Sequence, residues 1–328
     1  MIDIPEPWAW SVDQVRSHRC RNILVLGDAD RGKSTYCRYL CEQLLERGSH
    51  ETVAYVDADV GQKDIGPPAA ITLGYPQRGM TWTQIEPAAW HFVGNVTPVG
   101  QLLPTVLGSK HLVDAAQAHW TVINTPGFVR GVGRILQAHL IEAIRPHVII
   151  ALVHGRELSA LLKPYRYHRT LRLPPSPRAS TKTPPERQAN RERAFRRYFD
   201  HAQQLELTLK ELVLQRILLF TGTRIHLPPF PYAERTDEGI VAVAAADSPV
   251  PPHVQAMPLG FERHLLCGLS NRRRQGIGLG ILQRIDFEHG TLSLLTPVPA
   301  EQIRVLQFGD IYVGPAGREL GRRDHRVW

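Results

Sequence analysis

Two glycines, a lysine and a serine stand at a spacing suited to phosphate chemistry near the start of the chain. The stretch Gly27-Asp28-Ala29-Asp30-Arg31-Gly32-Lys33-Ser34 matches the G-x-x-x-x-G-K-S pattern of a Walker A loop. Glycines allow successive N–H groups to turn toward phosphates at a helix N-terminus. The residues predicted to bind a nucleoside triphosphate are Gly27, Asp28, Ala29, Asp30, Arg31, Gly32, Lys33, Ser34 and Thr35.

The segments that flank this loop have the required strand and helix character. Residues 21–26 form an apolar strand pattern, and residues 35–46 form a helical one. In this setting Lys33 would contact the β- and γ-phosphates and Ser34 would bind Mg²⁺. The loop carboxylates Asp28 and Asp30 are expected to point away from the phosphates.

Two more carboxylates follow a second predicted strand, residues 51–57. Asp57 and Asp59 stand at alternate positions, and Asp59 should project furthest once the strand turns into a loop. A carboxylate placed there can hold Mg²⁺ or accept a proton from an attacking hydroxyl. We therefore predict Ser34 and Asp59 as metal ligands.

The composition is that of a globular protein with a sizeable core. The 328 residues are 43% hydrophobic and 21% charged, enough for one large or two ordinary domains. No apolar stretch approaches the roughly 20 residues that span a bilayer, and the N-terminus lacks the features of a signal peptide. A cytoplasmic protein that does not contact membranes is expected.

Positive charge is concentrated in one segment. Residues 163–197 contain eleven basic and two acidic residues, a net +9, whereas the whole chain carries +8. This excess favours a polyanionic partner such as nucleic acid, and a solvated basic loop is the alternative. Arg272-Arg273-Arg274 could extend a nucleic-acid track, or could be a solvated turn.

Strand and helix patterns alternate over the first two thirds of the chain. Apolar strands are predicted at 89–94, 119–124, 146–153 and 215–220, and helices at 100–118, 134–144 and 186–214. Prolines exclude a regular helix or central strand over 171–185. We predict an α/β fold with a parallel sheet of P-loop NTPase type covered by helices on both faces.

The sequence pattern changes beyond the Pro228-Pro229 pair, where short β-prone runs alternate with turn residues. The predicted domains are therefore a P-loop domain at 1–229, with a basic lid segment at about 163–199, and a smaller β-rich C-terminal domain at 230–328.

A loop with the sequence Asn124-Thr125-Pro126-Gly127-Phe128 follows another strand and could be a G-protein-like switch. A GTPase would also need a guanine-reading N-K-x-D sequence, and the chain has none. The ordered set of motifs instead resembles the polynucleotide 5′-hydroxyl kinases, the family of the RNA kinase of the pre-mRNA cleavage complex and of the nucleolar kinase of ribosomal RNA processing. The motifs that carry this resemblance are Gly27 to Ser34, Asp57 to Gln62 (D-x-D-x-G-Q), His91 to Pro98, Thr125 to Phe128 (the clasp T-x-G-W), Arg191 to Phe199 (the lid) and parts of residues 267–298.

The resemblance implies a role for each motif residue. Asp59 would activate the 5′-hydroxyl or organise the Mg²⁺, and Gln62 would position the acceptor. Lys33, Arg191 and Arg196 would neutralise the transferring phosphate. The clasp residues Thr125, Pro126, Gly127 and Phe128 would hold the terminal nucleotide, with the aromatic ring stacking on its base.

This sequence departs from the family pattern in two ways. Phe128 stands where the clasp usually has Trp, which reduces the stacking face. Only about 20 residues precede the first strand, in place of the N-terminal β domain of eukaryotic members. Trp8 and Trp10 are candidates either for stacking on adenine or for anchoring the N-terminal arm.

The sequence as a whole predicts an ATP- and Mg²⁺-dependent kinase that phosphorylates the 5′-hydroxyl of RNA, DNA or both. One alternative is an ATP-binding scaffold of an RNA-processing complex that has lost transfer activity. Another is a P-loop kinase for a small molecule.

Overall fold

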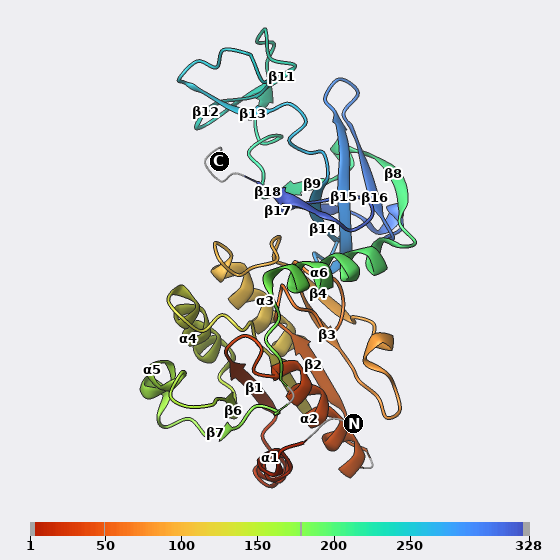
Figure 1. Cartoon of the computed structure of the whole chain (residues 1–328). Helices are drawn as coiled ribbons and strands as arrows, with labels where there is room; N and C mark the ends of the chain where they lie inside the picture. The colour runs from red at the N-terminus through yellow and green to blue at the C-terminus, as the bar shows by residue number, and fades with distance from the viewer. Residues whose placement is uncertain (1–3, 49, 178, 324–328) are drawn as a thin grey trace. The chain divides into compact units, whose positions relative to one another are not determined.

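A computed structural model of the chain describes residues 4–48, 50–177 and 179–323 (Figure 1). The chain divides into two compact units, residues 1–194 and 195–328. The division into domains at residues 229 and 230 stays a prediction, and below each compact unit is described by itself.

The first unit is built around a sheet of seven strands. Its order is β4-β3-β2-β5-β1-β6-β7, and the five strands from β2 to β7 in this order are parallel, whereas β3 and β4 are antiparallel. The strands are β1 (Asn22–Gly27), β2 (Val53–Asp57), β3 (Ala70–Gly74), β4 (Ala89–Phe92), β5 (Trp120–Asn124), β6 (Val148–Leu152) and β7 (Thr170–Leu173).

Helices follow most of the parallel strands. They are α1 (Glu6–Ser17), α2 (Lys33–Arg47), α3 (Leu102–Ala115), α4 (Val132–Ile144), α5 (Ser159–Leu162) and α6 (Pro184–Phe199), with 3-10 turns η1 (Trp82–Gln84) and η2 (Lys163–Tyr165). The α6 helix ends in the second unit.

Alternate residues of the central strands enter two separate cores, because successive side chains of a strand point to opposite faces. Ile23 and Val25 of β1 join a core with residues of α1 and α2. Leu24 and Leu26 join the opposite core, with residues of α3, α4 and α5. Helices therefore cover both faces of the sheet, which confirms the predicted α/β fold.

The loops after β1, β2 and β5 carry the predicted motifs. Since these strands are parallel neighbours in the order β2-β5-β1, their carboxyl ends meet at one edge of the sheet. Asp57 is level with Asn124 in the register of β2 and β5, and Asn124 is level with Val25 of β1. This edge is where the site must form.

The second unit is β-rich, as predicted for the C-terminal part of the chain. One sheet has the order β18-β17-β14-β15-β16-β8, with β9 also paired to β17, and the other has the order β10-β11-β12-β13. The strands are β8 (Gln203–Thr208), β9 (Val213–Gln215), β10 (Thr223–Arg224), β11 (Tyr232–Thr236), β12 (Gly239–Ala244), β13 (Val254–Pro258), β14 (Leu265–Ser270), β15 (Gly276–Asp286), β16 (Thr291–Thr296), β17 (Val305–Val313) and β18 (Glu319–Arg322), with 3-10 turns η3 (Leu209–Glu211) and η4 (Ala300–Gln302).

Two predicted elements are wrong. The helix expected over 186–214 ends at Phe199, because residues 203–208 alternate polar and apolar side chains and form β8. The strand expected at 215–220 does not extend the first sheet. Gln215 ends β9, and Ile217 and Leu219 are buried in the core of the second unit.

All four cysteines are free and buried, consistent with a packing role. Among the described residues, no helix is long and apolar enough to cross a membrane.

The N-terminal helix α1 is anchored by one tryptophan. Trp8 is fully buried, its ring meets Tyr36 edge-on at 5.1 Å between centroids, and its indole N–H donates to the carbonyl of Pro174 at 2.8 Å. Trp10 is 49% exposed. Trp8 is therefore a hydrophobic anchor and does not offer a free stacking face.

We expect Trp8→Ala to lower the free energy of unfolding of the first unit by about 3–5 kcal/mol, because it leaves a cavity and removes a buried hydrogen bond. Trp10→Ala is the control and should cost less than about 1 kcal/mol. Denaturant unfolding of the two variants measures the difference, and equal losses would show that the anchor has no special role.

Candidate active site

The phosphate-loop motif connects β1 to the N-terminus of α2. Gly32 has a φ of +75° and forms the N-cap of the helix, and Lys33 is its first residue. The left-handed torsion favours glycine, since a Cβ is strained there. The first N–H groups of α2 have no partner within the helix and form an anion site.

Lys33 is held inside the site. Its side chain is buried, and its ammonium donates to the carbonyl of Asp28 at 3.0 Å. Burial lowers the pKa of Lys33, and the carboxylate of Asp59 is the strongest of the charges that oppose this. The ammonium is therefore anchored beside the acidic residue that the sequence also singled out.

The two loop carboxylates are engaged with arginines. The Asp30 carboxylate accepts from Arg187 at 2.5 Å and from the N–H of Lys182 at 3.1 Å, and Asp30 lines the site cavity. The Asp28 carboxylate pairs with Arg130 at 3.1 Å. The expectation that both point away is wrong for Asp30, because it bridges the phosphate loop to the basic lid segment.

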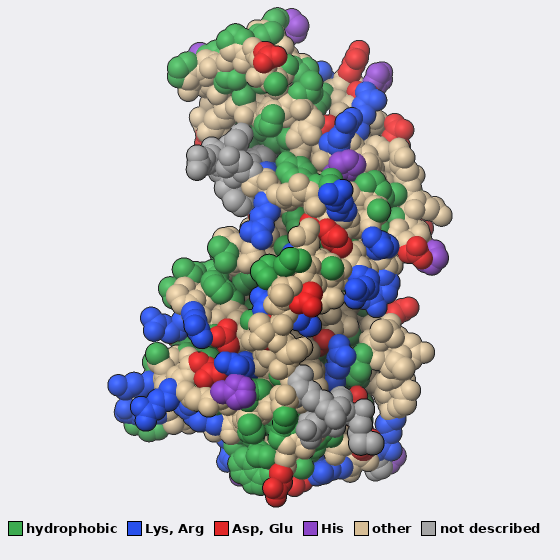
Figure 2. Space-filling model, viewed as in Figure 1, with side chains coloured by type: hydrophobic (Ala, Val, Ile, Leu, Met, Phe, Trp, Pro, Cys, Tyr) green, Lys and Arg blue, Asp and Glu red, His purple; other side chains and the backbone are tan. Residues whose placement is uncertain are grey.

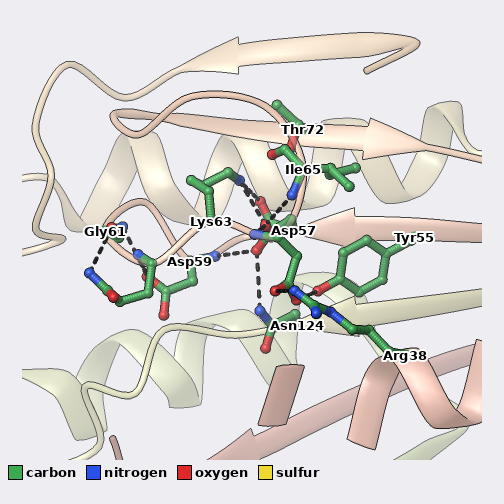
Figure 3. A network of polar contacts seen from close by, with 11 residues as sticks. Arg38, Tyr55, Asp57, Asp59, Gly61, Lys63, Ile65, Thr72 and Asn124 are labelled. Carbon is green, nitrogen blue, oxygen red and sulfur yellow. Dashed lines mark hydrogen bonds and ion pairs between the residues drawn. The ribbon is translucent and has the colours of Figure 1, made fainter. Parts of the chain in front are cut away.

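Asp57 lies at the centre of a buried polar network at the end of β2 (Figure 3). Its carboxylate forms an ion pair of 3.3 Å with Lys63, and both side chains are fully buried. The Lys63 ammonium also donates to the Asp57 carbonyl at 2.7 Å. Further donors to the Asp57 carboxylate are the N–H groups of Asp59, Asp64 and Ile65 and the amide of Asn124.

Burial raises the pKa of Asp57, and the Lys63 ammonium acts against that rise. Burial lowers the pKa of Lys63, and the Asp57 carboxylate acts against that fall. Each charge is tolerated in the interior because of the other. Asp57 is therefore a structural group that fixes the path of the following loop.

Asp59 uses one carboxylate oxygen to shape its loop and leaves the other available. Its Oδ1 accepts from the N–H groups of Gly61 and Gln62, both at 2.9 Å. Within the described parts of the chain, no hydrogen bond reaches Oδ2. A Cβ on Gly61 would lie 2.7 Å from the carbonyl oxygen of Val96, so this loop packs closely against the 91–98 motif.

The clasp residues are buried at Thr125 and Pro126 and half-buried at Gly127 and Phe128. Thr125 is fully buried, and its hydroxyl donates to the carbonyl of Val25. The amide of Gln137 on α4 donates to the carbonyls of Pro126 and Phe128 at 2.8 and 3.2 Å. Phe128 is half-buried and lines the cavity. The loop that carries the Phe128 ring is thus held by the Thr125 hydroxyl and by the Gln137 amide.

These loops surround a cavity of about 450 Å³ within the first unit. It is lined by most of the residues that the sequence predicted for the site. The predicted residues that line it are Ala29, Asp30, Gly32, Lys33, Ser34, Thr35, Asp59, Gln62, Pro126, Gly127, Phe128 and Arg191.

A few predicted residues do not line this cavity. Gly27 and Arg31 belong to the phosphate loop without lining the cavity. The Arg31 guanidinium pairs with Glu157 at 3.1 Å. Asp28 and Thr125 have the contacts described above. Arg196 belongs to the second unit, where its Nε donates to the carbonyl of Ala316 at 3.3 Å, and its role stays a prediction.

Sequence reasoning did not single out several residues that shape the site. Arg187 and Lys182 line the cavity, and both lie in the basic segment, whose sequence signal is its net charge. Lys63 directly follows the D-x-D-x-G-Q motif, so its place in the sequence was a usable signal. Gln137 had no signal, because its bonds to the clasp depend on how α4 packs.

The basic segment also includes an exposed surface next to α5. Lys163, Arg166 and Arg169 are exposed, and Tyr167 is 87% exposed with the Arg166 guanidinium 4.8 Å from its ring centroid. Figure 2 shows Lys and Arg side chains gathered over this part of the first unit, at the lower left of the view. Such a surface attracts polyanions.

The residues at the site suit a magnesium ion that is shared with a phosphate ligand. The described residues contain no group of three or more His, Cys, Asp or Glu side chains that could hold a metal alone. Mg²⁺ in phosphoryl-transfer sites needs only one or two protein oxygens, because phosphates and waters complete its shell. Ser34 and Asp59 line one cavity and can supply those oxygens.

Comparisons with known proteins agree with the motif order. The family model described as "mRNA cleavage and polyadenylation factor CLP1 P-loop" matches residues 27–201. A polyribonucleotide 5′-hydroxyl-kinase of Pyrococcus furiosus is 32% identical over 99% of this chain and 97% of its own length. One of Methanocaldococcus jannaschii is 32% identical over 98% of this chain and 95% of its own length.

More distant matches include a curated protein and a solved structure. The polyribonucleotide 5′-hydroxyl-kinase Clp1 of Xenopus tropicalis is 27% identical over 84% of this chain and 67% of its own length. A solved structure of Clp1p in complex with Pcf11p has a TM-score of 0.62 at 11% identity, covering 92% of this chain and 78% of that chain. At this identity the likeness concerns the fold alone.

Replacing one member of the buried pair should be costly. We expect Lys63→Met to lower the free energy of unfolding by about 3–5 kcal/mol, because it leaves the Asp57 carboxylate buried and uncompensated. Arg47→Met is the control, since it breaks an ion pair with Asp13 whose carboxylate is 64% exposed, and should cost at most about 1 kcal/mol. Similar losses in urea unfolding would rule out the structural role of the pair.

Proposed function

The chain belongs to the CLP1 P-loop family, and on that premise we propose that it is an ATP-dependent polynucleotide 5′-hydroxyl kinase. The reaction transfers the γ-phosphate of ATP to the 5′-hydroxyl of RNA, DNA or both. The single observation that carries the proposal is the shared cavity, which brings the phosphate loop, Asp59 and the clasp ring of Phe128 together.

The donor half of the cavity suits a triphosphate. Lys33 places a buried ammonium beside the N-terminus of α2, where the N–H groups and the helix dipole favour negative charge. Mg²⁺ held by Ser34 and Asp59 would supply charge neutralisation on the phosphates. The volume of about 450 Å³ lies in the range of small-ligand sites.

The acceptor half depends on Asp59. Its Oδ1 is fixed by two N–H groups, so Oδ2 is held in a defined direction and is open to a hydroxyl proton or to the metal. Gln62 lines the same cavity, and its amide donates to the carbonyl of Arg187 at 3.1 Å, which keeps it beside the lid segment. These two residues would position and activate the attacking hydroxyl.

The lid would stabilise the charge that develops on the transferring phosphate. Arg191 lines the cavity, and Arg187 is held there by Asp30. A guanidinium near the γ-phosphate acts as an arginine finger does. We also propose Arg196 for this role, on the strength of its place in the lid motif.

The acceptor is proposed to be a polynucleotide because of the clasp and the surrounding charge. Phe128 offers a ring that can stack on a base, and a base of any identity can stack in this way. The basic segment of residues 163–197 carries a net +9 and favours a polyanion over a neutral metabolite. An inactive ATP-binding scaffold and a small-molecule kinase remain the alternatives that the test must separate.

The test is transfer of label from γ-labelled ATP to a 5′-hydroxyl oligonucleotide in the presence of Mg²⁺. We expect the wild type to label RNA or DNA, and we expect Lys33→Ala and Asp59→Asn each to lower kcat by about 10²–10³-fold, since each removes a group that acts on developing charge or on the attacking hydroxyl.

ATP binding measured beside the labelling assay distinguishes the alternatives. A wild type that binds ATP without labelling any oligonucleotide would fit the scaffold instead. Label that appears only on small metabolites would fit the small-molecule kinase. Circular dichroism of each variant checks that the fold is retained.

Replacing lid arginines should separate turnover from nucleotide affinity. We expect Arg191→Ala and Arg196→Ala to lower kcat at least about ten-fold while changing the Kd for ATP by less than about two-fold, because a transition-state contact contributes little in the ground state. Arg193→Ala is the control, since Arg193 is exposed and does not line the cavity. Equal losses in kcat and in ATP affinity would contradict the role.

A further inference from the structure

The second unit contains an arginine-lined surface that is separate from the candidate active site. Two cavities of about 390 and 630 Å³ share Arg272 and Arg304 as lining residues. Arg273 lines the first cavity and Arg274 lines the second. Because they share two guanidiniums, the cavities adjoin and form one concave basic surface, which we call the arginine surface.

The backbone that carries three of these arginines is held rigidly. They lie in the turn between β14 and β15, where the Asn271 side-chain oxygen accepts from the N–H groups of Arg273 and Gln275 at 2.9 and 3.1 Å. The Arg274 N–H donates to the Asn271 carbonyl at 2.9 Å. The backbone of these arginines is therefore already ordered, so that binding a ligand costs little backbone conformational entropy.

Arg274 adopts an unusual backbone conformation. Its φ is +60°, in the left-handed region where glycine or asparagine is preferred. A residue with a Cβ is strained at this position, and strain of this kind concentrates at binding sites.

Arg304 joins this surface from the start of the neighbouring strand. Its N–H donates to the carbonyl of Ser270 at 2.9 Å, and its carbonyl accepts from the N–H of Val213 at 2.8 Å. The backbone of Arg304 is thus tied both to the end of β14 and to β9. Among the residues that the structure describes, its guanidinium makes one hydrogen bond, to the adjacent carbonyl of Ile303 at 2.6 Å.

None of the four guanidiniums forms an ion pair with a carboxylate among the described residues. Many arginines elsewhere in the chain do, including Arg16, Arg38, Arg130, Arg187 and Arg284. Glu211 and Glu301 line the two cavities without pairing with them. Four positive charges thus converge on a concave surface and remain available to an anionic ligand.

We propose that the arginine surface binds the phosphodiester backbone of the RNA substrate. This inference rests on the proposed function, which supplies the polynucleotide. A ligand that pairs with arginines in both adjoining cavities needs negative charges repeated at short intervals. A nucleic-acid strand carries one negative charge on every nucleotide. Backbone contacts of this kind add affinity without sequence preference.

The experiment compares two double variants of the full-length protein. Arg272→Gln/Arg304→Gln removes the two arginines that both cavities share. Arg235→Gln/Arg263→Gln removes the same charge from two exposed arginines of the second unit that line neither cavity. Binding of a fluorescent 30-nucleotide single-stranded RNA with a 5′-hydroxyl is measured from 50 to 300 mM salt. Phosphorylation is measured with that RNA and with a trinucleotide.

We expect the first double variant to bind the 30-nucleotide RNA about ten-fold more weakly at 0.15 M salt. The slope of log K against log salt concentration should become less negative by about 1.4, since two phosphate contacts are lost on a single strand. Its KM for the long RNA should rise by a similar factor, and its kcat on the trinucleotide should stay within two-fold of the wild type. The control variant should match the wild type in all four measurements.

RNA affinity and salt slope that are the same in the two double variants would overturn the proposal. Poly-L-glutamate serves as a second anionic probe. If the first double variant loses binding to poly-L-glutamate but keeps its RNA binding, the proposal is also overturned and an acidic protein partner is indicated. Weaker RNA binding by the first variant, in a wild type that transfers no phosphate, would support the arginine surface while refuting the kinase. The two proposals can therefore fail independently.

Discussion

A charge can be buried at the end of a central strand only if its surroundings compensate it, and the Asp57 carboxylate is compensated by Lys63 and four hydrogen-bond donors. These contacts bend the chain directly after β2 and close the loop that holds Asp59. The amide of Asn124 connects the same carboxylate to the end of β5, and β5 leads into the clasp. Two of the loops around the cavity therefore depend on one buried carboxylate.

The phosphate loop is connected to neighbouring segments by ion pairs that it does not need for its own fold. Asp30 is joined to Arg187 of the lid segment, and Asp28 to Arg130 beyond the clasp. Negative side chains in a loop that binds phosphates reduce its positive potential. For Asp30 that cost is offset because its carboxylate holds Arg187 at the lining of the cavity, whereas Arg130, the partner of Asp28, lies exposed outside it.

Local patterns predicted those parts of the structure that depend on neighbouring residues in sequence. The phosphate loop, the strand before Asp59 and the two-sided covering of the sheet all follow from glycine positions and apolar periodicity. Residues 203–208 also alternate polar and apolar side chains, but the charged helix that precedes them obscures this change of period, and the sequence therefore favours a continuous helix over β8.

What could not be read from the sequence were the contacts between distant side chains. The pairing of Asp30 with Arg187 spans 157 positions, and the bonds of Gln137 to the clasp depend on the packing of α4. The antiparallel β3 and β4 were equally hidden as a pair, because their pairing with each other and with β2 is decided by tertiary contacts that no periodicity encodes.

Gly127 of the clasp lies so close to the phosphate loop that a Cβ there would be 2.7 Å from the Cα of Ala29 and 3.1 Å from the ammonium of Lys33. The loop that we propose for the donor and the loop that we propose for the acceptor are thus in direct contact. If ligand binding shifts one of these loops, the contact between them transmits the shift to the other loop. By thermodynamic linkage, whatever factor the nucleotide applies to the affinity for the oligonucleotide, the oligonucleotide must apply to the affinity for the nucleotide.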